Sequence, residues 1–313
     1  MSNARQLAAN LPREGGLSNR NLIINGAMQV AQRGTSFTNY AGYTLDRWFI
    51  GNPATNSISQ QYDNTIGMYY MDATTSAAWG IFQWVENLNV RHLKAGDKVT
   101  VSYWVNTSSD TFQIKTTNTN DDNYTPSVIE TAGSWYRKAA VVTITSAQVS
   151  DIQSSAHLRF QFSPNQNSFQ ITGVQLEVGD TATPFEHRSY SDQLQACRRY
   201  YQNVYQRGNA AAGTYYSYYN RFSGNQIQFE PMRTGPTVSY SHTGGAFYWV
   251  DPGVSPYSAN TTSGFSYGAH QPNSSSMGAI DFSQARTSYG STPSNGGAYR
   301  LEASIIFHLD AEL

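Results

Sequence analysis

The chain has little charge and a single cysteine. Charged side chains make up only 13% of its 313 residues, against about 25% in an average globular protein. The formal net charge of −1 at pH 7 gives no long-range field to hold nucleic acid or an anionic membrane. With Cys197 as the only cysteine, an intrachain disulfide is excluded. Stability must therefore come from packing or from oligomerisation.

Long apolar runs are also missing. The first seven residues lack the charged-then-apolar order of a signal peptide, and no apolar run is long enough to cross a bilayer. We expect that the protein is synthesised in a cytoplasm and does not insert into a membrane. Any role at a surface would then require release as part of a particle.

Polar uncharged residues and aromatic rings replace the missing charge. The chain has 22 tyrosines and 6 tryptophans, whereas disordered chains are poor in aromatic residues. Segments of alternating polarity recur, for example at 99–105 and 158–162. The longest runs over 300–313, where every odd position is apolar; such a strand must lie inside a sheet or against a symmetry mate. These features predict an all-β fold.

One strand changes its apolar side halfway. Phe169 and Ile171 share one parity, whereas Val174 and Leu176 share the other, and Gly173 lies between the two pairs. Because strand side chains alternate between faces, such a switch needs an extra residue or a kink. The sequence therefore predicts a bulge at Gly173.

One helix is expected, and one further segment is either a short helix or an unstructured terminus. Residues 189–205 carry apolar side chains at helical spacing, at Leu194, Cys197, Tyr201 and Val204. This stripe is either a seam between subunits or the inner face of a linker helix on its own sandwich. Residues 3–11 could form a short helix with Leu7 and Leu11 on one stripe, or an unstructured terminus.

Four segments carry a resemblance to a known family. Asn21–Met28, Ala31–Ser36, Tyr43–Trp48 and Ile171–Arg188 together resemble the jelly-roll module of bacteriophage tail-fibre and receptor-binding appendage proteins. Residues 229–237 and 309–313 resemble C-terminal segments often joined to that module. The resemblance implies a carbohydrate-binding-like jelly-roll sandwich and a homotrimer.

This resemblance divides the chain into four parts. Residues 1–20 are expected to be a virion-attachment segment, with Leu7 and Leu11 anchoring it to phage tail or portal-adaptor proteins. Residues 21–188 would form the jelly roll, 189–205 a connecting helix, and 206–313 a C-terminal receptor-binding β-sandwich. The expected location is the virion tail.

Groups that carry chemistry are sparse. No serine stands in a Gly-x-Ser-x-Gly setting, and Cys197 is interpreted as a packed thiol. The alternate spacing of Asn118, Asn120 and Asp122 lacks the glycine and final glutamate of a calcium loop. The acidic residues form no aromatic-flanked pair of the kind a glycosidase needs. We therefore expect no catalytic residue, no metal, no cofactor and no enzymatic activity.

Clustered aromatic residues are the better indication of function. Sugar rings stack on aromatic faces while amides bind their hydroxyls, although most such rings fill cores and interfaces. The candidate ligand-binding residues are Tyr216, Tyr218, Tyr248, Trp249 and Tyr257, together with the loops of residues 250–298. The expected function is host attachment by binding host surface polysaccharide. The alternatives are a structural tail adaptor that does not bind host cells and, less favoured, a polysaccharide-degrading tailspike.

Overall fold

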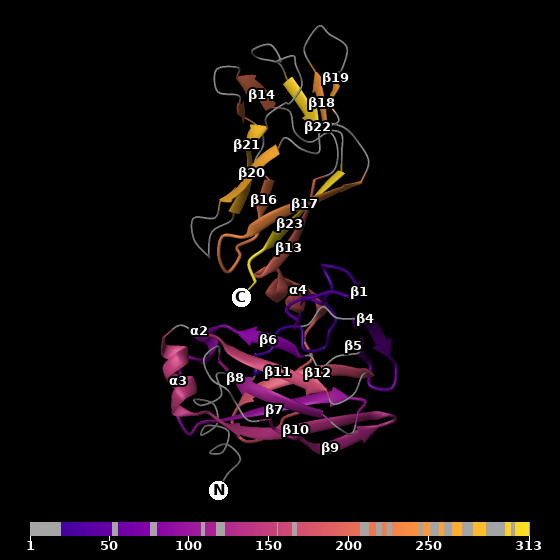
Figure 1. Cartoon of the computed structure of the whole chain (residues 1–313), viewed down its shortest axis with the longest axis vertical. Helices are drawn as coiled ribbons and strands as arrows, with labels where there is room; N and C mark the ends of the chain where they lie inside the picture. The colour runs from indigo at the N-terminus through magenta and orange to yellow at the C-terminus, as the bar shows by residue number, and fades with distance from the viewer. Residues whose placement is uncertain are drawn as a thin grey trace. The chain divides into compact units, whose positions relative to one another are not determined.

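The computed structural model shows a chain built almost entirely of antiparallel β-sheets (Figure 1), which confirms the predicted all-β class. The structure describes residues 20–51, 56–75, 80–107, 110–116, 123–154, 156–164, 168–206, 213–216, 221–223, 227–243, 247–250, 257–259, 265–270, 278–285, 298–301 and 304–312. The chain divides into two compact units. The first unit ends at Cys197, and the second comprises Arg198–Glu312.

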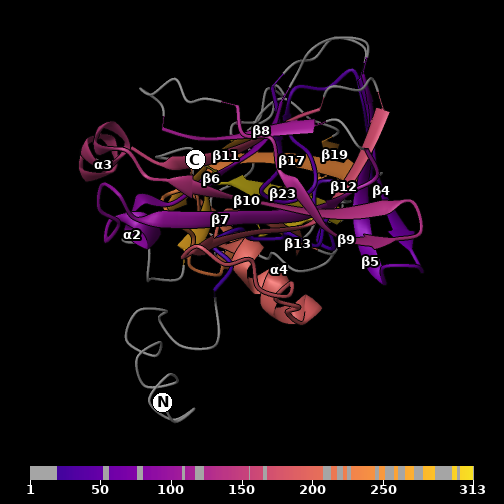
Figure 2. The same ribbon diagram turned by 90° about the horizontal axis from the view of Figure 1, so that it is seen from below.

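Two sheets form the first unit. One has seven strands in the order β1-β4-β5-β12-β7-β10-β9, and the other has five in the order β2-β3-β6-β11-β8. They lie as two layers, with β8 and β11 in one and β7 and β10 in the other (Figure 2). The seven strands are β1 (Ser36–Thr38), β4 (Asn56–Asp63), β5 (Met68–Thr75), β7 (Lys98–Val105), β9 (Ser127–Ala132), β10 (Trp135–Thr143) and β12 (Ser168–Val178). The five are β2 (Gly42–Tyr43), β3 (Phe49–Ile50), β6 (Ile81–Val85), β8 (Asp110–Lys115) and β11 (Leu158–Pro164), and the unit also contains helices α2 (Asn87–Val90), α3 (Ser146–Gln153) and α4 (Tyr190–Arg198).

The core lies between the two sheets. Every second side chain of β7 points inward, so Tyr103 of β7 meets Phe160 and Phe162 of β11 with ring centroids 6.3 and 5.4 Å apart. Phe162 in turn contacts Phe169 of β12 at 5.3 Å. The alternation of the sequence in β7 and β11 is thus the alternation between core and outer face.

The predicted bulge at Gly173 is confirmed. The register of β12 against β7 shifts between Thr172 and Gln175, and Gly173 has a φ of 57°. An added Cβ there would lie 2.8 Å from Cδ1 of Trp104. Only glycine fits this position without strain, and the bulge lets both halves of β12 bury their apolar side chains.

The predicted helix over 189–205 is wrong in its second half. Helix α4 ends at Arg198, and Tyr201–Gln206 forms strand β13, which pairs along its length with β23 (Ser304–Asp310). Strand β23 is apolar on one face and would be exposed without a paired neighbour. Its pairing with residues 201–206 is therefore more favourable than the helix that their spacing predicts. Leu194 and Cys197 therefore share no helical stripe with Tyr201 and Val204. Cys197 is buried within the first unit, as a packed thiol should be.

The described strands of the second unit form three sheets. Their strand orders are β13-β23-β17, β15-β14-β22-β18-β19 and β16-β21-β20. The predicted continuous strand over 300–313 is instead divided between β22 and β23, which belong to different sheets, although β23 is central in its own sheet as expected. The remaining strands are β14 (Gly213–Tyr216), β15 (Arg221–Ser223), β16 (Ile227–Phe229), β17 (Thr237–Thr243), β18 (Phe247–Val250), β19 (Tyr257–Ala259), β20 (Phe265–His270), β21 (Gly278–Ala285) and β22 (Ala298–Leu301).

Candidate functional site

The polar residues of the N-terminal segment are structural. The Asn21 side chain donates from Nδ2 to the carbonyl of Val174 at 2.9 Å and accepts at Oδ1 from the amides of Ile23 and Leu176, at 2.9 and 3.1 Å. Asn25 is fully buried and donates to the carbonyl of Val30 at 2.9 Å. These amides satisfy backbone groups of an irregular segment that lies against β12.

The segment after β12 is held in the same way. The Gln175 Oε1 accepts from the amide of Glu186 at 2.8 Å, and a carboxylate oxygen of Glu177 accepts from the amide of Thr183 at 3.2 Å. Glu186 in turn forms a 3.1 Å ion pair with Arg188. Both glutamates are thus occupied in holding residues 183–188 over the outer face of the seven-stranded sheet.

The ligand-binding residues predicted from sequence lie partly together. Tyr216 is in β14, Tyr248 and Trp249 are in β18, and Tyr257 is in β19, all strands of one five-stranded sheet. Trp249 is directly opposite Tyr257 in the register. Tyr218, Leu7 and Leu11 lie outside the described residues. A ligand-binding role for these tyrosines and Trp249 stays a prediction.

A different aromatic surface, which the sequence reading missed, lies on the outer face of the five-stranded sheet of the first unit. Tyr43 is opposite Phe49, and Phe49 is opposite Phe82, on three successive strands. The ring centroids are 5.1 Å apart in the first pair and 4.7 Å in the second. Trp84 extends the row, 5.9 Å from Phe82. All four rings are half-buried, and we call these four residues the aromatic row.

The alternation of β6 explains why this surface was missed. Its polar residue, Gln83, faces inward and is 1% exposed, while Phe82 and Trp84 face outward. Gln83 is satisfied inside because its amide exchanges two 2.8 Å hydrogen bonds with the backbone of Ile24. The usual reading, polar side outward, therefore assigns the faces of β6 the wrong way round.

Amide and guanidinium groups continue the aromatic row along the sheet. Gln161 of β11 is opposite Phe82, and Gln113 of β8 is opposite Gln161. The guanidinium of Arg159 lies 4.9 Å from the ring centroids of both Phe82 and Trp84. Burial lowers the pKa of Arg159 below its ordinary value, yet a guanidinium remains charged at neutral pH.

This arrangement has the chemistry of a ligand-binding surface. Partly exposed aromatic rings beside a few polar groups are typical of small-molecule sites. Rings that are half-buried lose little conformational freedom when a flat ligand stacks on them. The amides of Gln113 and Gln161 both donate and accept hydrogen bonds, which suits hydroxyl groups.

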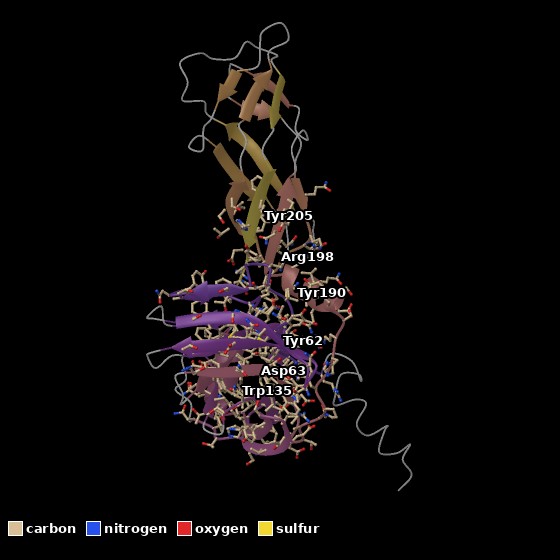
Figure 3. The ribbon with its side chains drawn as sticks, turned by 90° about the vertical axis from the view of Figure 1, so that its right-hand side faces the viewer. Tyr62, Asp63, Trp135, Tyr190, Arg198 and Tyr205 are labelled. Carbon is tan, nitrogen blue, oxygen red and sulfur yellow. The ribbon has the colours of Figure 1, made fainter. Side chains whose placement is uncertain are left out.

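A second, smaller aromatic pair lies at the end of the β4-β5 hairpin. Tyr62 and Tyr69 are directly opposite each other, 52% and 43% exposed, with ring centroids 5.1 Å apart. Asp63 and Trp135 lie nearby (Figure 3). Burial favours a higher pKa for Asp63, but hydrogen bonds from Trp135, Thr65 and the Ile66 amide outweigh it and lower the pKa.

Within the described residues of the second unit, a serine, a histidine and an asparagine form a cluster of catalytic residue types. Ser241 Oγ lies 2.9 Å from His308 Nε2, and Asn203 Oδ1 lies 2.8 Å from His308 Nδ1. The three residues come from β17, β23 and β13 and share one face of their sheet. Because an amide oxygen only accepts, Asn203 places the ring proton on Nδ1 and leaves Nε2 to accept from the serine. The Tyr201 hydroxyl is also 3.0 Å from Nδ1.

The part of the chain that the structure describes contains no group of three or more His, Cys, Asp or Glu side chains that could hold a metal ion. None of the helices in this part is long and apolar enough to cross a membrane.

Comparisons with known proteins complete the description of the site. No family model matches the chain, and no curated protein sequence matches it. Among solved structures the chain is similar to the enzymatically active domain of tailspike protein 4 of bacteriophage CBA120, at 11% identity and a TM-score of 0.32. The match covers 51% of this chain and 22% of the tailspike chain, well under two thirds of it.

This match requires one correction. The prediction that the chain is not an enzyme is contradicted, because the similar domain is described as enzymatically active. At this TM-score the likeness assigns no activity, substrate or catalytic residue to the chain.

Proposed function

We propose that the chain is a bacteriophage tail protein that attaches to host cells by binding a surface glycan on the aromatic row. In this proposal the protein is a homotrimer located in the virion tail and joined to other tail or portal-adaptor proteins through its N-terminal residues. The resemblance of the segments within 21–48 and 171–188 to phage appendage modules supports the virion assignment. The low charge and high aromatic content fit a protein whose purpose is to present a surface.

The strand order supports a jelly roll for the first unit. Strands β5, β12, β7 and β10 are neighbours in one sheet, and β6, β11 and β8 are neighbours in the other. Successive strands thus cross between the two layers, as they do in two Greek keys folded together. An isolated bridge between Phe112 and Tyr124 lies beside β8, where the eighth strand of such a fold would pair.

The aromatic row is the observation that carries the glycan proposal. Its rings come from three neighbouring strands, and Gln161 and Gln113 follow Phe82 in the same register. A sugar stacked on Phe82 would have its hydroxyls within reach of these amides. Contacts of this kind are individually weak, and several copies of the chain on one particle would multiply them through avidity.

Binding of the purified chain to host cells, with and without competing extracted surface polysaccharide, tests this proposal. Phe82→Ala and Trp84→Ala should each weaken binding about tenfold or more, because truncation of a central aromatic contact costs over about 1.4 kcal/mol. Tyr62→Ala, which removes an exposed ring elsewhere on the same unit, is the matched control. Binding that survives both row variants would refute the site, and a protein that binds no cells would favour the adaptor alternative.

A second candidate function, ester hydrolysis, is supported by the Ser241–His308–Asn203 geometry. Ser241 Oγ would attack an ester carbonyl while its proton passes to His308 Nε2, which then protonates the leaving alcohol. Water would release the acid by the same route and restore the serine. A fluorophosphonate probe that labels the chain but not Ser241→Ala would establish this function, whereas an unlabelled chain would refute it.

A further inference from the structure

Two positive charges face each other on the sheet that carries the aromatic row. Arg159 of β11 and Lys115 of β8 are directly opposite in the register, and both are half-buried on the outer face. Like charges at directly opposed positions destabilise a sheet. The ion pairs within the described residues include neither side chain.

The Arg159 guanidinium has unused hydrogen-bonding capacity. Its Nε is buried without a hydrogen-bond partner, and its described side-chain contacts are the two rings, each 4.9 Å from the guanidinium carbon. Phe82 and Trp84 hold the planar group in place. A guanidinium that is fixed in position and short of partners is ready to bind a planar oxyanion with two hydrogen bonds.

We infer that this face binds a sugar carrying a carboxylate, with Arg159 and Lys115 holding the acid while the aromatic row stacks the sugar ring. The inference rests on the proposed glycan function and names the class of glycan. The bound carboxylate would pair with Arg159 and relieve the repulsion between the two cations. Gln161 and Gln113 lie in the neighbouring row of the register, where their amides would be close to the hydroxyls of a stacked sugar.

Two matched ligands distinguish recognition of the carboxylate from recognition of the sugar ring. The probes are tri-galacturonate and its carboxyl-reduced counterpart, titrated into the full chain and followed by tryptophan fluorescence and by the indole N–H resonance of Trp84. Tri-galacturonate should bind about tenfold to a hundredfold more tightly, because a bidentate charge-assisted pair contributes that much. Inorganic phosphate is the competitor that distinguishes a general oxyanion site from one that needs the sugar.

Three variants locate the effect. Arg159→Gln should abolish the preference for the acid, and Arg159→Lys should retain only part of it, since an ammonium lacks the planar fork. Arg33→Gln is the charge-matched control: Arg33 lies 5.3 Å from the ring centroid of Tyr43, at the other end of the aromatic row. It should leave the preference largely intact. The free energy of unfolding of Arg159→Gln should be at least as high as that of the parent chain, because the substitution removes the repulsion from Lys115.

The possible outcomes are distinct. Equal binding of both trisaccharides would refute the acidic class while leaving glycan binding in place. Equal losses in Arg33→Gln and Arg159→Gln, or complete displacement by millimolar phosphate, would refute the specific role of Arg159. Absence of a Trp84 response to either trisaccharide at about 10 mM, roughly tenfold above a Kd of about 1 mM, would overturn the proposed function of this face itself.

Discussion

A buried ion pair in the first unit allows a sharp test of how the core is stabilised. Lys138 Nζ pairs with Asp110, whose other oxygen accepts a hydrogen bond from the hydroxyl of Tyr103. The side chains of Lys138 and Asp110 are only 3% and 0% exposed. All three groups therefore lie in the core, where each depends on the others for its hydrogen bonds.

Removal of Lys138 alone should be severely destabilising. Lys138→Met leaves the Asp110 carboxylate buried without its cation, which costs about 3–5 kcal/mol of unfolding free energy. With a urea m value of about 2 kcal/mol per molar, the unfolding midpoint should fall by about 1.5–2.5 M. Tryptophan fluorescence is the suitable probe, because five of the six tryptophans precede residue 198 and thus report on the first unit.

A triple variant separates the loss of charge balance from the loss of packing. Lys138→Met, Asp110→Leu and Tyr103→Phe together replace the whole buried group with apolar side chains of similar size. Such replacement is often neutral or stabilising, so the triple variant should unfold at or above the parent midpoint. A single variant that shifts the midpoint by less than about 0.5 M, equivalent to roughly 1 kcal/mol, would refute this reasoning. A triple variant as unstable as Lys138→Met would refute it equally.

Three further predictions concern the bulge and the titrating groups. Gly173→Ala should lower the unfolding free energy by more than about 2 kcal/mol, because left-handed strain of about 1–2 kcal/mol adds to a steric clash. Gly67→Ala, at a φ of 65° with nothing within 4 Å, isolates the strain and should lower the unfolding free energy by less; equal losses in urea unfolding would contradict the clash. Burial, followed by the neighbouring carboxylate, raises the pKa of Tyr103 well above its ordinary value. Its contribution to the free energy of unfolding is therefore complete below the unfolded-state pKa of about 10. That contribution is lost as the pH rises from there through the folded-state pKa. Tyr103→Phe should flatten the alkaline limb of a melting-temperature profile, and an unchanged limb would count against this. Burial opposes but does not outweigh the hydrogen bonds that lower the pKa of Asp63, so its contribution to the free energy of unfolding is present above about pH 3.9 and declines as the pH falls through its folded-state pKa. Asp63→Asn should therefore weaken the pH dependence of the melting temperature on the acid side. An acid side identical to that of the parent would contradict the assignment.

The sequence predicted the structure correctly where the outcome depended only on neighbouring residues along one strand. The parity change around Gly173 could be read directly, because a strand has only two faces and the switch required an extra residue. The core strands β7 and β11 were equally clear, since each places a continuous row of apolar residues on its core face. The fold class followed from these segments without knowledge of any long-range contact.

The failures have a common physical cause, which is that a distant partner decided the outcome. Residues 201–206 carry helical spacing, but β23 provides backbone hydrogen bonds along their whole length and turns them into a strand. In β6 the inward position of Gln83 depends on the backbone of Ile24, 59 residues earlier. The aromatic row could have been suspected only from the two aromatic residues that flank this glutamine.

The few charges of the chain explain why Arg159 is informative. Where charged side chains are sparse, those that fold into partly buried positions are expected to be paired, since an unpaired buried charge is costly. Lys138 has Asp110, and Arg188 has Glu186, each with its own acid in the first unit. Arg159 departs from this pattern, because its described contacts are two aromatic rings and a lysine faces it across the sheet. A fold that pairs Lys138 and Arg188 with acids but leaves Arg159 on an outward-facing aromatic surface retains a binding capacity directed at something outside the chain. An anionic group on a stacking ligand fits that capacity, and for this reason the acidic trisaccharide, rather than a neutral one, is the decisive probe.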